Sequence, residues 1–131
     1  MELTVATKWK VVMIADATDE DFAPLAPVLG MLSEAGAIPE LWNDGAEGLR
    51  RLMVEKADLV LVDLDTPSLC GMEAQMRIAQ VALKVPVILM SNRMGIERRM
   101  WALESGAVSI VTKPIDGRTL FRYIDKLLNI Q

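Results

Sequence analysis

Four short apolar runs dominate the hydropathy pattern of the chain, and each of them ends on a polar residue. The runs are Val11–Asp16, Ala57–Asp63, Val85–Ser91 and Val108–Lys113. Continuous apolar runs of this length are typical of strands buried on both faces, as in a parallel sheet covered by helices. In open sheets of that kind, the carboxyl ends of the strands form the ligand-binding edge. The pattern therefore predicts a site at that edge, built from two carboxylates, a hydroxyl and an ammonium group.

Helical segments are predicted between these runs, so that strand and helix alternate five times. The expected strands are Trp9–Ala15, Ile38–Trp42, Leu59–Asp63, Pro86–Ser91 and Val108–Thr112. The expected helices are Pro24–Ala35, Ala46–Lys56, Met72–Leu83, Ile96–Ser105 and a last one that reaches Leu128. Such alternation predicts an α/β fold with a doubly wound, five-stranded parallel sheet and helices on both faces.

Local signals mark the expected helix ends. Gly36 and Gly106 are expected to end two helices, Asn43 or Asp44 to cap the second helix, and Asp116 to cap the last. No repeat, low-complexity segment or linker divides the chain. Residues 1–131 are therefore expected to form one domain.

The composition excludes several classes of protein. Hydrophobic residues make up 52% of the 131 positions, which excludes a largely disordered chain. The balance of 14 basic and 18 acidic residues, without a basic cluster, makes direct nucleic acid binding a poor hypothesis. The absence of histidine excludes Ser-His-Asp triads and histidine-ligated metal sites. No apolar run approaches membrane-spanning length, and the single cysteine, Cys70, favours a reducing cytoplasm.

Four segments occur in order and at suitable spacings: Lys10–Asp16 (KVVMIAD), Leu59–Glu73 (LVLVDLDTPSLCGME), Val85–Ser91 (VPVILMS) and Ala102–Pro114 (ALESGAVSIVTKP). Together they resemble the receiver domain of bacterial two-component response regulators, of the chemotaxis type. The resemblance implies a flavodoxin-like fold and Mg²⁺ dependence. It also implies phosphorylation of an aspartate by the phosphohistidine of a histidine kinase or phosphotransfer protein. Such a domain is not an enzyme, beyond self-catalysed phosphoryl transfer and autodephosphorylation.

The resemblance also assigns roles to individual residues. Asp63 matches the phosphoacceptor, and Asp16 matches the second of two acidic residues at the end of the first strand. Ser91 matches the hydroxyl residue that follows the phosphoryl group, and Lys113 matches the lysine before proline. Asp65 matches the position whose backbone carbonyl reaches the metal, so the implied metal ligands are Asp16, Asp63 and Asp65.

The chemistry accounts for these residue types. Mg²⁺ prefers hard oxygen ligands, typically one or two carboxylates with water and phosphate oxygens. The ammonium of Lys113 supplies a mobile charge for phosphoryl oxygens, and Ser91 supplies a single hydroxyl donor. Each residue also has a plainer interpretation: Asp63 caps the next turn, Ser91 ends a strand and Lys113 is solvated. The joint placement of Asp63 and Lys113 favours the functional interpretation.

Several departures from the family pattern concern the metal site and the switch. Ala15 stands where the first of the two adjacent acids is usual, so we expect weaker metal binding. The loop that follows carries acidic residues at 19–21, which either replace the missing acid or form a solvated loop with a helix cap. Ile110 stands where many receivers have an aromatic switch residue, and Asn92 stands where a small residue is common. These two departures put the usual aromatic switch in doubt.

Three further classes of protein are alternatives to a phosphoaccepting receiver. A pseudo-receiver, which uses the same fold as an interaction module without phosphorylation, is favoured by Ala15 and Ile110. A haloacid-dehalogenase-type phosphohydrolase is suggested by Asp63 and Asp65, but Pro67 stands where that motif requires Thr or Val. A cobalamin-binding module is excluded because no histidine is present.

The partner-facing surface is expected on the fourth helix, the fifth strand and the last helix, where a homodimer or an output domain would bind. On the fourth helix, Ile96, Met100 and Leu103 are expected to face the sheet, with Trp101 off that stripe as an anchor or lying over neighbouring aliphatic stems. Arg93 is expected to face Asp65 across the site.

Overall fold

The computed structural model describes residues 8–16, 18, 20–69, 71–92 and 95–130, without the side chain of Asp21. Its single sheet is parallel and has the strand order β2-β1-β3-β4-β5. The strands are β1 (Lys10–Ile14), β2 (Ile38–Trp42), β3 (Leu59–Asp63), β4 (Val87–Ser91) and β5 (Ser109–Thr112). The helices are α1 (Ala26–Glu34), α2 (Gly45–Arg51), α3 (Met72–Ala82), α4 (Ile96–Glu104) and α5 (Gly117–Leu128), with 3₁₀ turns η1 (Glu20–Phe22) and η2 (Pro67–Leu69). The predicted doubly wound, five-stranded sheet is confirmed.

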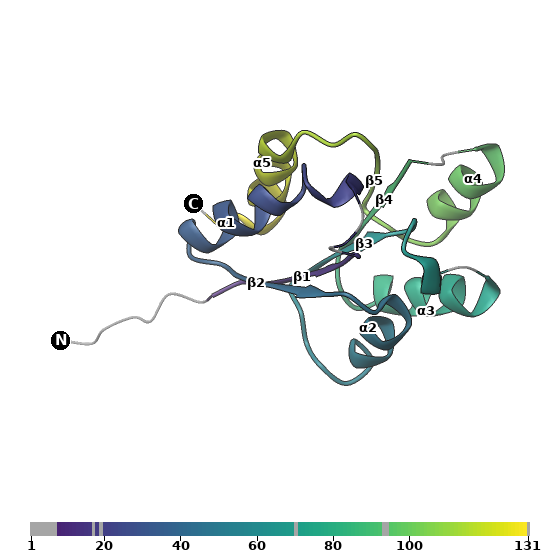
Figure 1. Cartoon of the computed structure of the whole chain (residues 1–131). Helices are drawn as coiled ribbons and strands as arrows, with labels where there is room; N and C mark the ends of the chain where they lie inside the picture. Colours follow the sequence, from purple (N-terminus) through teal and green to yellow (C-terminus); the bar gives the residue numbers. More distant parts are fainter. Residues whose placement is uncertain (1–7, 17, 19, 70, 93–94, 131) are drawn as a thin grey trace.

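The three central strands are completely buried except for the first residue of β1. Because successive side chains of a strand point to opposite faces, each strand contributes to two cores. Val11, Met13 and Ala15 pack under α1 and α5, whereas Val12 and Ile14 pack against the helices of the other face. Figure 1 shows α1 and α5 on one side of the sheet and α2 and α3 on the other, with α4 beyond β4 and β5.

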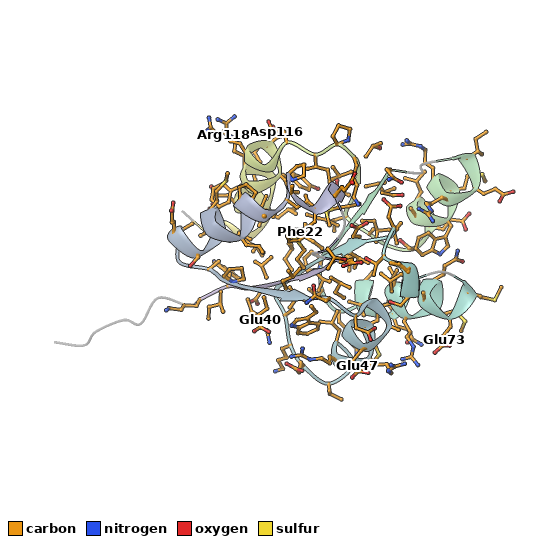
Figure 2. All side chains as sticks on the ribbon, viewed as in Figure 1. Phe22, Glu40, Glu47, Glu73, Asp116 and Arg118 are labelled. Carbon is orange, nitrogen blue, oxygen red and sulfur yellow. The ribbon has the colours of Figure 1, made fainter. Side chains whose placement is uncertain are left out.

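Polar side chains surround these two apolar layers. In Figure 2, Phe22 points inward beneath α1, while Glu47, Glu73 and Arg118 lie at the periphery of the molecule. Among the described residues, no helix combines the length and hydropathy that crossing a membrane requires.

Most helix boundaries follow the local signals. The carboxylate of Asp44 accepts a hydrogen bond from the Glu47 amide at 3.1 Å, and that of Asp116 accepts one from the Arg118 amide at 3.2 Å, so both caps are confirmed. Gly36 and Gly106 follow α1 and α4 with φ of 94° and 90°, a conformation that favours glycine. One cap differs: α1 begins at Ala26, and Leu25, rather than an acidic residue of the preceding loop, occupies its N-cap position.

The orientation of α4 differs from the sequence prediction. Ile96, Met100 and Leu103 are 80%, 57% and 68% exposed, so this apolar stripe faces solvent instead of the sheet. The inward stripe consists of Arg98, Trp101, Ala102 and Ser105, of which Ala102 is fully buried and Trp101 is half-buried. Hydropathy periodicity predicted the wrong stripe because, apart from Trp101, the inward positions carry the polar residues Arg98 and Ser105 and the small residue Ala102.

This orientation predicts effects of very different size for two neighbouring substitutions. Ala102→Leu should lower the free energy of unfolding by roughly 2 kcal/mol, because extra methylene groups must enter a packed core. The matched change Leu103→Ala should alter it by less than about 0.5 kcal/mol, as is usual at exposed positions. Urea unfolding of both variants measures the difference. A larger loss in Leu103→Ala than in Ala102→Leu would restore the orientation expected from hydropathy.

Candidate functional site

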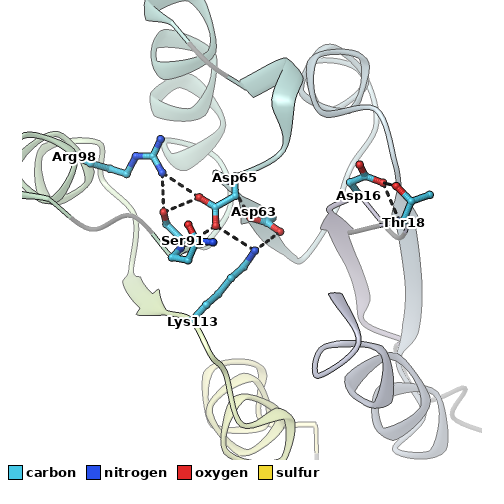
Figure 3. A network of polar contacts seen from close by, with 8 residues as sticks. Asp16, Thr18, Asp63, Asp65, Ser91, Arg98 and Lys113 are labelled. Atoms are coloured by element: carbon cyan, nitrogen blue, oxygen red, sulfur yellow. Dashed lines mark hydrogen bonds and ion pairs between the residues drawn. The ribbon is translucent and has the colours of Figure 1, made fainter. Parts of the chain in front are cut away.

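Three neighbouring strands deliver polar side chains to the carboxyl edge of the sheet. Asp63 ends β3, Ser91 ends β4, and Lys113 directly follows β5. The order β3-β4-β5 places these strand ends side by side. The Lys113 amide donates to the Ser91 carbonyl at 2.9 Å, which fixes the start of the loop after β5, and the peptide bond to Pro114 is cis. The parallel topology therefore brings together three of the four polar groups that the apolar runs predicted, whereas the fourth, Asp16, lies to one side (Figure 3).

Lys113 lies at the centre of this site. Its side chain is 4% exposed, and its Nζ donates to Oδ2 of Asp63 at 2.7 Å. The same Nζ lies 3.2 Å from Oδ2 of Asp65. One buried ammonium thus faces two carboxylates, which excludes the plainer interpretation of Lys113 as a solvated side chain.

Asp65 contributes its carboxylate to the site, whereas the sequence analysis assigned only its backbone carbonyl to the metal and expected its side chain to face Arg93 at the site entrance. Its Oδ1 accepts from the Ser91 hydroxyl at 3.0 Å and from Nη1 of Arg98 at 3.2 Å, and its Oδ2 accepts from the Asn92 amide at 2.8 Å. Arg98 also donates to the Ser91 hydroxyl at 2.7 Å. Figure 3 shows these groups converging, with Arg98 reaching in from α4. The Asp65 side chain is 9% exposed.

Arg98 is the residue that sequence reasoning missed. Arg93, the expected partner of Asp65, lies outside the described residues. The only signal for Arg98 was its position on α4, three and four residues before Trp101 and Ala102, and hydropathy placed a different stripe, Ile96, Met100 and Leu103, against the sheet. Recognising the correct inward face of α4 would have placed Arg98 near the strand ends.

Burial and hydrogen bonding shift the pKa values of these groups in different directions. Burial raises the pKa of Asp63, and the hydrogen bonds from Lys113 and the Asp65 amide counter only part of this effect. Burial acts to lower the pKa of Lys113, but the hydrogen bond and charge of Asp63 outweigh it and raise that pKa. For Asp65, burial is opposed by donors from Asn92, Ser91 and Lys113, so its pKa is lowered. Lys113 is thus held as a cation and Asp65 as an anion.

Asp16 lies two residues after β1 and makes local contacts. Its Oδ1 accepts from the Thr18 hydroxyl at 2.6 Å and from the Thr18 amide at 2.9 Å, and these bonds lower its pKa. Figure 3 shows Asp16 turned toward Thr18, to one side of the Asp63–Lys113 pair.

The described residues do not form a complete set of metal ligands. Among them, no three Asp, Glu or Cys side chains lie close enough together to hold a metal ion. Glu20 is exposed, while Asp19 and the side chain of Asp21 are outside the described residues. The ends of the neighbouring strands β1 and β3 nevertheless supply Asp16 and Asp63, hard oxygen donors of the type that Mg²⁺ prefers.

Comparison with known families identifies the domain. The family model described as response regulator receiver domain matches residues 10–125, which is most of the chain. The chain belongs to the response regulator receiver family. Receiver domains act in two-component signalling and are in general phosphoacceptors rather than enzymes.

Relatives of this receiver domain differ in length. It is 36% identical over 110 residues to the transcriptional regulatory protein GlrR of Escherichia coli, covering 83% of the chain but 25% of that protein. It is 28% identical over 112 residues to protein PilH of Pseudomonas aeruginosa, covering 84% of the chain and 93% of PilH. The chain thus spans a quarter of one relative and nearly all of the other.

Solved structures confirm the fold of this receiver domain. A CheY-like receiver domain protein from Methanospirillum hungatei matches with a TM-score of 0.77 and 23% identity, covering 94% of this chain and 95% of the other. The predicted flavodoxin-like fold and family membership are both confirmed.

Proposed function

We propose that Asp63 accepts a phosphoryl group from the phosphohistidine of a histidine kinase or phosphotransfer protein, in a reaction that depends on Mg²⁺. The observation that carries this proposal is the buried contact between the Asp63 carboxylate and Nζ of Lys113 at the carboxyl edge of the sheet. Family membership favours this role over that of a pseudo-receiver.

The proposed transfer exchanges one bond to phosphorus for another. A carboxylate oxygen of Asp63 forms a bond to phosphorus while the bond from phosphorus to the imidazole nitrogen of the donor breaks. The electron pair of the broken bond stays on the imidazole. Lys113 and Ser91 would hold the transferred oxygens, and hydrolysis by water would later return Asp63 to the free carboxylate.

Mg²⁺ would be held by the carboxylates of Asp16 and Asp63 and by the backbone carbonyl of Asp65. When bound, it supplies positive charge that offsets the repulsion between an anionic donor and a carboxylate. Ala15 is buried in the core beneath α1 and α5, so this position supplies no carboxylate. Asp16 must also exchange its hydrogen bonds with Thr18 for the metal, and both features favour weak binding.

The phosphorylated domain would act through α4, β5 and α5, either on an output domain or on a second copy of the chain. Exposed apolar side chains on α4 and just before β5 support this surface: Ile96, Met100, Leu103 and Val108. Trp101 lies inward of this stripe and packs against the core. We therefore expect the exposed apolar residues, rather than Trp101, to anchor a partner. Cytoplasmic location, where histidine kinases present their phosphohistidine, is part of the same proposal.

Intact mass measurement with a small phosphodonor tests this function. With Mg²⁺ and phosphoramidate, the wild type should gain the mass of one phosphoryl group, and a chelator should prevent the gain. Asp16→Ala should require a Mg²⁺ concentration roughly tenfold higher for the same rate, because one carboxylate ligand is lost. The matched variant Asp58→Ala removes an acid that bonds the Lys10 amide, away from the site, and should keep the wild-type Mg²⁺ requirement. A wild-type mass that never shifts would contradict the proposal.

A further inference from the structure

We propose that the Asp65 carboxylate occupies the phosphoryl-binding site while Asp63 is unphosphorylated. We further propose that Arg98 couples the displacement of this carboxylate to helix α4. This inference rests on the proposed function of Asp63. It concerns the unphosphorylated state, in which Asp65 already binds the groups that a phosphoryl group on Asp63 would need.

The contacts of Asp65 form a complete anion site. Its two oxygens contact the Ser91 hydroxyl, the Asn92 amide, the Arg98 guanidinium and the Lys113 ammonium, at distances from 2.8 to 3.2 Å. These four donors come from the end of β4, from α4 and from the loop after β5. A carboxylate has about four lone-pair positions, so its hydrogen-bonding capacity is filled.

A phosphoryl group on Asp63 would compete for the same donors. It adds roughly 1.5 to 2 negative charges and three acceptor oxygens, and a hydroxyl, an ammonium and a backbone amide are suitable partners for it. Asp65 is two residues from Asp63 and shares Nζ of Lys113 with it. The Ser91 hydroxyl and the Asn92 amide each carry one hydrogen and cannot serve both anions, and repulsion in a buried site favours the departure of the Asp65 carboxylate. Asp65 should therefore slow phosphoryl uptake.

Arg98 links this exchange to α4. Its Nη1 bonds both Ser91 and Asp65, and its side chain is 33% exposed, so it is free to follow either anion. Arg98 also lines a pocket of about 250 Å³ between α3 and α4, together with Trp101 on the next turn of the helix. A shift of Arg98 would change the surroundings of the Trp101 ring. Ile110, half-buried on β5, has no aromatic ring to perform such a coupling.

Inorganic phosphate tests occupancy of the site without any phosphorylation. The Asn92 backbone amide, which donates to Asp65, serves as the reporter by ¹⁵N NMR. In Asp65→Asn, phosphate should shift this resonance at concentrations roughly tenfold lower than in the wild type, because the competing charge is gone. Glu104→Gln, which removes an exposed charge from α4, should respond like the wild type. Equal phosphate dependence in the wild type and Asp65→Asn would overturn the proposal, whether or not Asp63 accepts a phosphoryl group.

Phosphorylation of the same proteins tests the coupling. In a Trp9→Phe/Trp42→Phe background, phosphorylation should change the emission of Trp101, and Asp65→Asn should accelerate phosphoryl uptake by several fold. In Arg98→Gln, the change in Trp101 emission per incorporated phosphoryl group should disappear. In the control Arg99→Gln, at an exposed neighbouring position, the change should remain. Phosphoryl uptake with an unchanged Trp101 response in Arg98→Gln would refute the coupling and leave the function of Asp63 intact.

Discussion

Asp63→Asn is expected to abolish phosphoryl uptake completely, the largest effect of any single substitution in this protein. The amide has nearly the shape of the carboxylate but lacks the anionic oxygen that must attack phosphorus. Asp63 is buried at the end of β3, so its loss is not easily replaced by an exposed acid. Intact mass after incubation with phosphoramidate and Mg²⁺ measures the result.

Asp65→Asn is the matched control for that experiment, because it makes the same chemical change two residues away. It should retain the gain of one phosphoryl group, as Asp65 is not the nucleophile. Circular dichroism should show both variants folded, since Lys113 keeps one carboxylate partner in each. A phosphoryl gain that persists in Asp63→Asn and is lost in Asp65→Asn would move the acceptor to Asp65.

Lys113→Met is expected to lower the free energy of unfolding by about 3 kcal/mol, in the range observed when one partner of a buried ion pair is removed. The substitution keeps an unbranched side chain but leaves the carboxylates of Asp63 and Asp65 in a buried site with less compensating charge. Urea unfolding at neutral pH measures the loss. Because folding raises the pKa of Lys113, its contribution is complete below its ordinary value of 10.5 and is lost only as pH rises through the folded value.

Two comparisons separate the ion pair from general effects of losing a lysine. Lys84→Met, at an exposed position after α3, should change the free energy of unfolding by less than about 0.5 kcal/mol. Adding Asp65→Asn to Lys113→Met should recover part of the loss, because one of the two uncompensated charges is removed. If Lys113→Met costs no more than Lys84→Met, the buried pair contributes nothing to stability.

The sequence alone determined the strands, the burial of β1, β3 and β4, and three of the polar residues that meet at the carboxyl edge, but β5, also expected to be buried, is a partly exposed edge strand. The apolar runs before Asp63, Ser91 and Lys113 are long enough to be recognised without tertiary information. Parallel topology then brings their ends together. The caps Asp44 and Asp116 were also predictable, because each bonds an amide two or three residues away. These features depend on neighbours in the chain or on a repeating pattern.

Tertiary structure decided the contacts of the Asp65 side chain and the inward face of α4. Asp65 and Arg98 are 33 residues apart, and no local pattern relates them. Besides Trp101, the inward stripe of α4 carries the charged Arg98 and the small residues Ala102 and Ser105, and polar partners at the strand ends compensate for the burial of Arg98. Hydropathy periodicity predicts which face of a helix packs inward only when the burial of apolar side chains alone decides the orientation. On α4, the packing of Ala102 and the hydrogen bonds of Arg98 selected the face instead.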